Sequence, residues 1–102
     1  MSVAIETNAT VAVIVELFGN AQLIAGQRLV PIEVPPDCTS GEIAKVLAQQ
    51  HPRLIGKVIR SDISGFLSSY SANLNGIQFV RDDRIKLKNG DSLLLFSSQA
   101  GG

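Results

Sequence analysis

The last two residues of the chain, Gly101 and Gly102, have the most distinctive chemistry in the sequence. They place an α-carboxylate on an arm without side chains near its tip, so the arm can enter a narrow channel in an extended form. Four residues counted from Gln99 reach at most about 13–14 Å, which is far enough to bring the carboxylate into a partner's active site. A carboxylate reacts only after activation, for example as an acyl-adenylate. The partner must therefore supply ATP and the catalytic groups.

Other reactive side chains are few. The sequence has one His, one Cys and no Trp, so a Cys/His zinc site cannot be built within one chain. Cys38 and His51 could form a nucleophile–base pair, but no third group is positioned to orient the base. His51 precedes Pro52 at an expected helix end, which indicates a capping or surface role. Cys38 follows a proline-rich stretch and is predicted to be a passive loop thiol. We expect no self-contained enzyme, no bound cofactor and no metal.

Length and composition limit the function further. A chain of 102 residues with 45% hydrophobic and 18% charged residues is typical of one small globular domain. Nine Lys+Arg balance nine Asp+Glu, which argues against binding to nucleic acid or to an anionic membrane. No apolar run approaches the roughly eighteen residues of a membrane helix, and the N-terminus lacks the pattern of a secretory signal. With a single cysteine, the composition favours a cytoplasmic protein.

The first third of the chain predicts a strand and a short helical turn. Val11–Val15 is a β-branched run, typical of a strand that is buried on at least one face. Asn20 is expected to cap a single helical turn at Leu23–Ala25. Gly26 suits the left-handed position that closes such a turn.

The next elements are an edge strand and the main helix. Leu29–Val34 reads as a strand, and Pro31, which has no backbone donor, indicates that it lies at an edge. Thr39 and Glu42 have the spacing of a capping box, in which each side chain bonds the other residue's backbone N–H. The periodicity then predicts a helix over Ser40–Gln50. Its buried face is expected to pack Ile43, Val46 and Leu47 against Val13, Val15, Leu93 and Leu95.

The second half of the chain alternates loops and strands. The signal is weak over 53–69, where Leu54, Val58 and Ile59 fit a loose helical turn and Ser61–Ser69 fits a loop. Tyr70–Leu74 and Gln78–Val80 are expected to form a hairpin around Asn75-Gly76. Charged residues 81–84 and the segment Leu87–Asp91 are predicted turns. Ser92–Ser97 is apolar on both sides, which is typical of a strand inside a sheet.

This order of elements predicts the α+β class, with one main helix across a mixed sheet of four or five strands. A right-handed crossover through the helix would place the last strand parallel to the first. We expect a flexible N-terminal extension at 1–9, the folded domain at 10–98 and a flexible tail at 99–102.

The residues around the last strand resemble the ubiquitin-like sulfur carriers of the MoaD/ThiS type, which include the small subunit of molybdopterin synthase. The resemblance rests on Leu87–Asp91, the apolar strand that follows, and Gly101-Gly102 six residues beyond that strand's apolar end. Ala25-Gly26, the Thr39–Glu42 helix start and Asn75-Gly76 also match features of the family. The resemblance covers about residues 10–102. The segment 51–69 is similar in length to that of carriers that serve cysteine synthesis.

The resemblance implies a β-grasp fold and gives Gly102 the functional carboxylate. An adenylyltransferase similar to ubiquitin-activating enzymes would adenylate it with ATP, and a sulfur donor, a sulfurtransferase or cysteine desulfurase, would convert it to a thiocarboxylate. An acceptor synthase would then take up the sulfur. Gly101, Ala100 and Gln99 would lie in the partner's channel. Phe96 and Phe79 are candidate docking residues, although packing in the core explains large aromatics equally well.

Two other functions remain compatible with the sequence. One is a ubiquitin-like protein modifier that forms an isopeptide bond through Gly102. The other is a ubiquitin-like interaction or regulatory domain without sulfur chemistry. Arg53, Lys57 and Arg60 have helical spacing and could meet an acidic partner, but a solvated face is the simpler interpretation.

Overall fold

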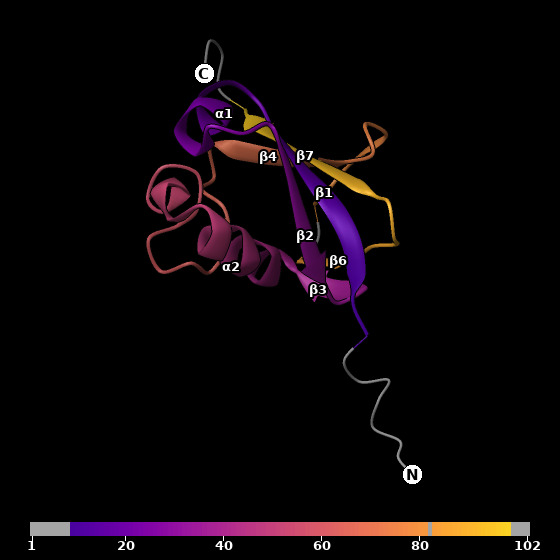
Figure 1. Cartoon of the computed structure of the whole chain (residues 1–102). Coiled ribbons are helices and arrows are strands. Elements are labelled where there is room, and N and C mark those ends of the chain that lie inside the picture. The colour runs from indigo at the N-terminus through magenta and orange to yellow at the C-terminus, as the bar shows by residue number, and fades with distance from the viewer. Residues whose placement is uncertain (1–8, 82, 99–102) are drawn as a thin grey trace.

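The computed structural model describes residues 9–81 and 83–98, and it has two sheets and two α-helices (Figure 1). The main sheet carries helix α2 on one side, and a small second sheet lies at one end of it. In chain order the elements are β1 (Val11–Leu17), α1 (Gly19–Ala25), β2 (Leu29–Val34), β3 (Asp37–Thr39), α2 (Ser40–Gln50), the 3-10 helix η2 (Pro52–Leu54), β4 (Tyr70–Leu74), β5 (Gln78–Phe79), β6 (Arg84–Lys86) and β7 (Ser92–Ser97).

The main sheet has the strand order β2-β1-β7-β4-β5 and is mixed. The first and last strands, β1 and β7, run parallel at its centre, and the other neighbours are antiparallel. This arrangement confirms the predicted α+β fold, a five-stranded mixed sheet with one main helix. It also confirms that β7 is an interior strand and that β2, which contains Pro31, is an edge strand.

Helix α2 covers one face of the sheet. The capping box is formed as predicted: the Glu42 N–H donates to Thr39 Oγ1 at 3.1 Å, and the Thr39 N–H donates to Glu42 Oε1 at 2.8 Å. Ile43 and Leu47 are fully buried, but Val46 is only partly buried. Val46 packs against the edge of the core, beside Pro31 and Ile32 of β2, and Ala44 and Ala48 are buried as well.

Helix α1 differs from the predicted single turn. It begins at Gly19, so Asn20 lies inside it, and the N-cap residue is Phe18, which makes no side-chain cap. Phe18 continues the extended backbone of β1, and its ring contacts Phe96 with centroids 6.4 Å apart. Packing therefore sets the start of α1. Its end is as predicted: Gly26 has φ 72° and donates its N–H to Gln22 O at 2.8 Å.

The weak segment 53–69 is anchored by apolar side chains. Leu54, Val58 and Ile59 are fully buried, and η2 with the turns after it takes the place of the expected helical turn. Arg53, Lys57 and Arg60 are exposed, but no α-helix spans them, so their helical spacing does not define a helix face.

The second sheet was not predicted. Strand β3 pairs antiparallel with β6, so Cys38 lies in a strand and not in a loop, and Arg84 begins a strand and does not end a turn. The pairing forms because Cys38 and Ile85, which are opposite each other, both enter the core. Burial, followed by the nearby Glu42 and Asp37 carboxylates, raises the pKa of the Cys38 thiol, which keeps it protonated and unreactive.

Candidate functional site

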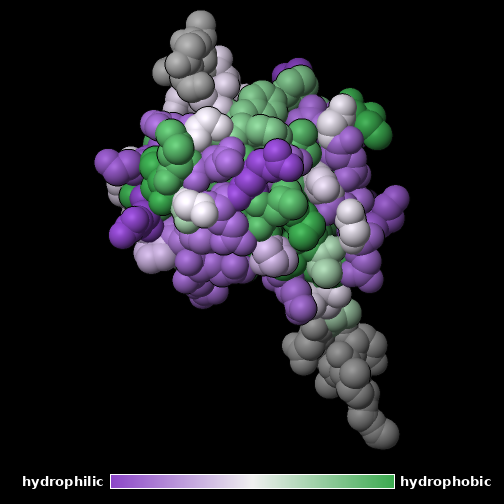
Figure 2. All heavy atoms as spheres, turned by 45° about the horizontal axis from the view of Figure 1, so that its top comes forward, coloured by the Kyte–Doolittle hydropathy of each residue, from purple (hydrophilic) through white to green (hydrophobic). Residues whose placement is uncertain are grey.

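The main sheet has one covered face and one face without a covering helix among the described residues. Alternation along β7 sends Leu93 and Leu95 into the core, both fully buried, and sends Leu94 and Phe96 to the opposite side, where they are only partly buried. We call this second side the open face. Its apolar residues are Ile14, Phe18, Phe79, Leu94 and Phe96. Figure 2 shows hydrophobic side chains gathered in separate patches on the surface, with hydrophilic side chains between them.

Three phenylalanines form a row on the open face. The ring of Phe96 contacts Phe18 on one side and Phe79 on the other, with centroids 6.4 Å and 6.0 Å apart and both pairs edge to face. Phe79 is 48% exposed, and the Arg81 guanidinium lies 5.9 Å from its ring centroid. Exposed aromatic rings flanked by Arg are typical of the centre of a protein–protein interface.

Asn73 is an unusual polar residue on the open face. It lies opposite Phe79 in the β4–β5 pair and opposite Leu94 in the β4–β7 pair, and it is only 8% exposed. Its Oδ1 atom has no hydrogen-bond partner among the described residues. A buried acceptor without a partner destabilises the folded protein.

The turn before β7 joins three strands. Asp91 accepts hydrogen bonds from the Lys88 N–H at Oδ2 and from Asn75 Nδ2 at Oδ1, at 2.8 Å and 3.1 Å. These bonds, the one from the Lys88 backbone first, lower the pKa of Asp91. Asn89 Oδ1 accepts from the Ala12 N–H at 2.8 Å. The turn thus fixes β7 relative to β1 and to the end of β4.

The base of the C-terminal arm is attached to the sheet. Both the N–H and the hydroxyl of Ser98 donate to Ser69 O, at 2.7 Å and 2.9 Å. Ser98 is two residues beyond Phe96, so the arm starts at the end of the sheet where the aromatic row lies. A partner that covers the open face would therefore also meet the start of the arm.

The predicted site residues divide into two groups. Phe96 and Phe79 lie on the open face in contact with each other. Gln99, Ala100, Gly101 and Gly102, as well as most of the predicted N-terminal extension, lie outside the described residues. The sequence reasoning did not select Ile14, Phe18 or Leu94. The signal that could have found them was the strand Ser92–Ser97, which is apolar on both sides. One main helix can cover only one face of a sheet, so the apolar residues on the other side must face outward.

No group of three His, Cys, Asp or Glu residues within 9–81 and 83–98 is placed to hold a metal ion. In the same part of the chain, no helix has the length and apolar character needed to cross a bilayer.

Comparison with known proteins gives structural matches only: neither a family model nor a curated protein sequence matches the chain. SAMP1 from Haloferax volcanii has 27% identity and a TM-score of 0.73, covering 89% of this chain and 99% of that one. Small archaeal modifier protein 1 from Methanosarcina acetivorans has 19% identity and a TM-score of 0.76, covering 93% and 100%. A Pyrococcus furiosus protein assigned as molybdopterin converting factor, subunit 1, has 23% identity and a TM-score of 0.62, covering 85% and 97%.

These neighbours are MoaD/ThiS-like, ubiquitin-like proteins, and the chain shares their β-grasp fold. The likeness spans nearly the whole of each neighbour, so the fold extends over the full domain and is not limited to one motif. It supports a role as a sulfur carrier or as a ubiquitin-like modifier.

Proposed function

We propose that this protein is a sulfur carrier whose Gly102 carboxylate is adenylated and then converted to a thiocarboxylate. In the first step a carboxylate oxygen attacks the α-phosphate of ATP, and pyrophosphate leaves. In the second step the outer sulfur of a donor persulfide attacks the acyl carbon and AMP leaves, which forms an acyl disulfide. A thiol then attacks the donor's sulfur, so the donor leaves in a disulfide with that thiol and the C-terminus keeps one sulfur in place of one oxygen. An acceptor synthase takes up that sulfur for molybdopterin, cysteine or another sulfur-containing product.

One observation carries this proposal: an apolar open face and the base of a Gly-Gly arm lie at the same end of a β-grasp sheet. The activating enzyme supplies the catalytic groups, so this chain acts as a co-substrate and not as an enzyme. Its own contribution is to present the arm. Phe96 and Phe79 dock on the partner, and the slim residues Ala100 and Gly101 let the carboxylate enter the channel.

Conjugation through Gly102 to lysines of other proteins is the second candidate. The names of the Haloferax volcanii and Methanosarcina acetivorans neighbours favour it, because those proteins are described as small archaeal modifier proteins. Both functions use the same fold and the same activation. They differ only in the group that attacks the activated carbonyl, a sulfur donor or a lysine amine.

Intact-mass analysis tests the proposal. The protein is incubated with ATP, a ubiquitin-activating-like adenylyltransferase from the same organism and a sulfur source. A C-terminus with one oxygen replaced by sulfur is the expected product. Deletion of Gly102, or one residue added beyond it, should abolish adenylation and loading. Gly101→Val should reduce loading because a β-branched side chain widens and stiffens the arm.

Control experiments distinguish a sulfur carrier from a modifier and from a protein with neither function. Gly90→Ala changes a glycine at the opposite end of β7 from the arm and should leave loading unchanged in whatever fraction of the protein folds. Conjugate ladders that need Gly102, without the sulfur-containing mass, would favour the modifier. Absence of both the adenylate and the sulfur exchange, together with a harmless deletion of the arm in cells, would reject both candidates.

A further inference from the structure

The two edge strands of the main sheet differ in how they meet solvent. The Leu17 N–H of β1 donates to Arg28 O at 2.8 Å, and in an antiparallel pair every second residue bonds the partner strand. The backbone N–H and C=O groups of Leu29, Pro31 and Glu33 in β2 therefore point away from β1. Pro31 has no N–H to offer. The Gln27 side chain donates to Leu29 O at 2.7 Å, and the Gln50 side chain donates to Pro31 O at 2.8 Å. This edge is blocked against an added strand.

The opposite edge, β5, is open. Val80 bonds Ala72 of β4, its N–H donating to Ala72 O at 2.9 Å, so Phe79 and Arg81 direct their backbone groups away from the sheet. Within the described residues, neither backbone N–H has a hydrogen-bond partner. No proline lies in this edge, and Phe79 is 48% exposed. An unpaired edge of this kind accepts a strand from another protein.

A groove lies directly against this edge. It has a volume of about 590 Å³ and runs between β5 and β6, and its apolar lining is Leu74, Phe79, Val80 and Ile85. A second hollow of about 440 Å³ shares Phe79, Val80, Arg81 and Ile85 with it and continues toward Tyr70. A strand paired to β5 would place every second side chain over this groove.

The rim of the groove is basic. Arg81, Arg84 and Lys86 line it, and no carboxylate is among its described lining residues. Arg84 is already paired with Asp37, with Nε 3.2 Å from Oδ1, which leaves Arg81 and Lys86 without an acidic partner there. Asp83 lines only the second hollow. Two copies of this chain joined edge to edge would bring the basic rims together, which disfavours self-pairing.

From the open edge, the groove and the basic rim, we propose that β5 is a docking site for an extended acidic segment of a partner protein. The segment adds as a sixth strand, with its backbone bonding Phe79 and Arg81. Its apolar side chains enter the groove, and its carboxylates meet Arg81 and Lys86. This site does not use Gly102, so the proposal stands apart from the sulfur chemistry.

A capped synthetic octapeptide that alternates valine and glutamate is the probe, and one that alternates valine and lysine is its control. Each is added to the ¹⁵N-labelled full-length protein, and amide hydrogen exchange is followed by NMR. With nine-tenths of the sites occupied by the glutamate peptide, exchange at Phe79 and Arg81 should slow about tenfold. The backbone amides of Leu29 and Glu33 on the blocked edge should not change.

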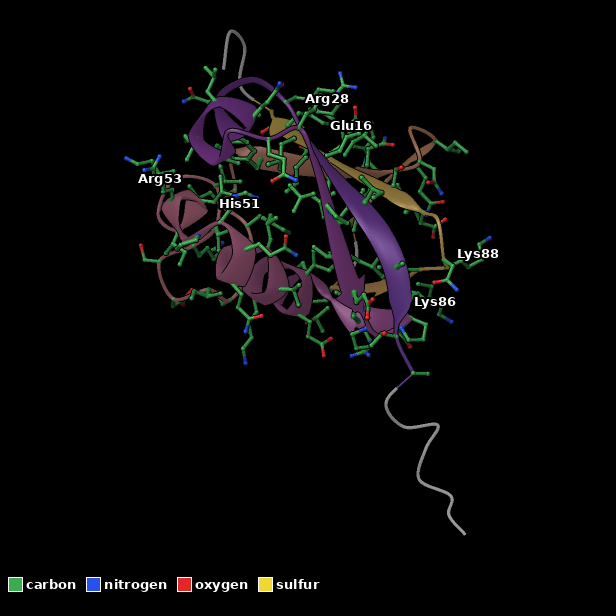
Figure 3. All side chains as sticks on the ribbon, viewed as in Figure 1. Glu16, Arg28, His51, Arg53, Lys86 and Lys88 are labelled. Atoms are coloured by element: carbon green, nitrogen blue, oxygen red, sulfur yellow. The ribbon has the colours of Figure 1, made fainter. Side chains whose placement is uncertain are left out.

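Charge reversal tests the rim. Arg81→Glu combined with Lys86→Glu should weaken the glutamate peptide about tenfold and create a preference for the lysine peptide. Arg84 is left unchanged because it pairs with Asp37. The matched control, Arg53→Glu with Lys57→Glu, makes the same change in net charge away from the groove, and Figure 3 shows Arg53 and Lys86 at opposite sides of the molecule. The control should keep the native preference.

Three results would overturn the proposal. Equal binding of the two peptides would remove the basic rim as the recognition element. Protection at Leu29 and Glu33 instead of Phe79 would assign docking to the other edge. Protection of Phe79 that rises with protein concentration and needs no peptide would identify the occupant as a second copy of the chain.

Discussion

The two faces of the main sheet are built from the same strands, but they serve different purposes. On the covered face Leu93 and Leu95 of β7 are fully buried in the core. On the open face Leu94 and Phe96 of the same strand remain partly exposed. Both faces are apolar at the centre of the sheet, so hydrophobicity alone does not distinguish core from surface. The difference arises from the single helix, which can cover only one face.

This comparison explains where the protein has room for a partner. The covered face obtains its stability from packing, and its residues cannot be exposed without unfolding. The open face keeps aromatic rings accessible, among them Phe79, which is 48% exposed. Apolar surface that is retained in this way indicates an interaction site. Substitutions on the two faces should therefore separate stability from function.

The largest effect is expected on the covered face. Leu95→Ala or Leu47→Ala should lower the free energy of unfolding by about 2–5 kcal/mol, because each side chain is fully buried and leaves a cavity. Urea unfolding followed by circular dichroism measures this. Val46→Ala, at the partly buried position of the same helix, should cost clearly less. Equal losses at Leu47 and Val46 would show that α2 packs in a different rotation.

The turn that leads into β7 should have the next largest effect. Asp91→Asn cannot accept both hydrogen bonds as a carboxylate does, so it should lose about 1–3 kcal/mol of stability at pH 7. The pKa of Asp91 is lowered in the folded protein. The charged carboxylate therefore stabilises the fold fully above the ordinary carboxyl pKa of about 4, and this stabilisation is lost as the pH falls through the lowered pKa of the folded protein.

Urea midpoints measured from pH 7 down to pH 3 check this sign. The difference between wild type and Asp91→Asn should shrink as the pH falls. A difference that stays constant would mean that the charged form of Asp91 does not carry the effect.

Loss of the capping box should have a smaller effect on the covering helix. Thr39→Ala removes the acceptor for the Glu42 N–H and should cost about 1 kcal/mol. Thermal unfolding measures the change. Thr10→Ala, which removes an exposed hydroxyl bonded to Glu33 at 3.3 Å, is the matched control and should change little. If the two variants behave alike, the cap does not stabilise α2.

The smallest effect on stability is expected on the open face, together with a clear effect on function. Phe96→Leu keeps an apolar side chain but removes two ring contacts, so it should cost about 0.5 kcal/mol. Adenylation of Gly102 by the activating enzyme should nevertheless slow, because the aromatic row is the proposed docking surface. Pyrophosphate release measures the rate. An unchanged rate with Phe96→Leu and Phe79→Leu combined would assign docking to another surface.

The sequence by itself determined the local elements that depend on neighbouring residues. Thr39 and Glu42 defined the start of α2, Gly26 defined the end of α1, and the apolar segment Ser92–Ser97 identified the central strand. These signals are readable because caps, turns and alternation involve residues a few positions apart. The carboxylate arm at Gly102 was read in the same way and stays a prediction.

Only the tertiary structure decided the features that join distant segments. Pairing of β3 with β6 moved Cys38 from a loop into the core, and contact of Phe18 with Phe96 set the start of α1 in place of the Asn20 cap. That Ala44 and Ala48 are buried while Val46 is only partly buried depends on which segments pack around α2. The position of α2 decides which side of β7 is covered. The side chains of Gln27 and Gln50 decide which edge of the sheet is blocked. These are long-range contacts, which no local pattern of residues encodes.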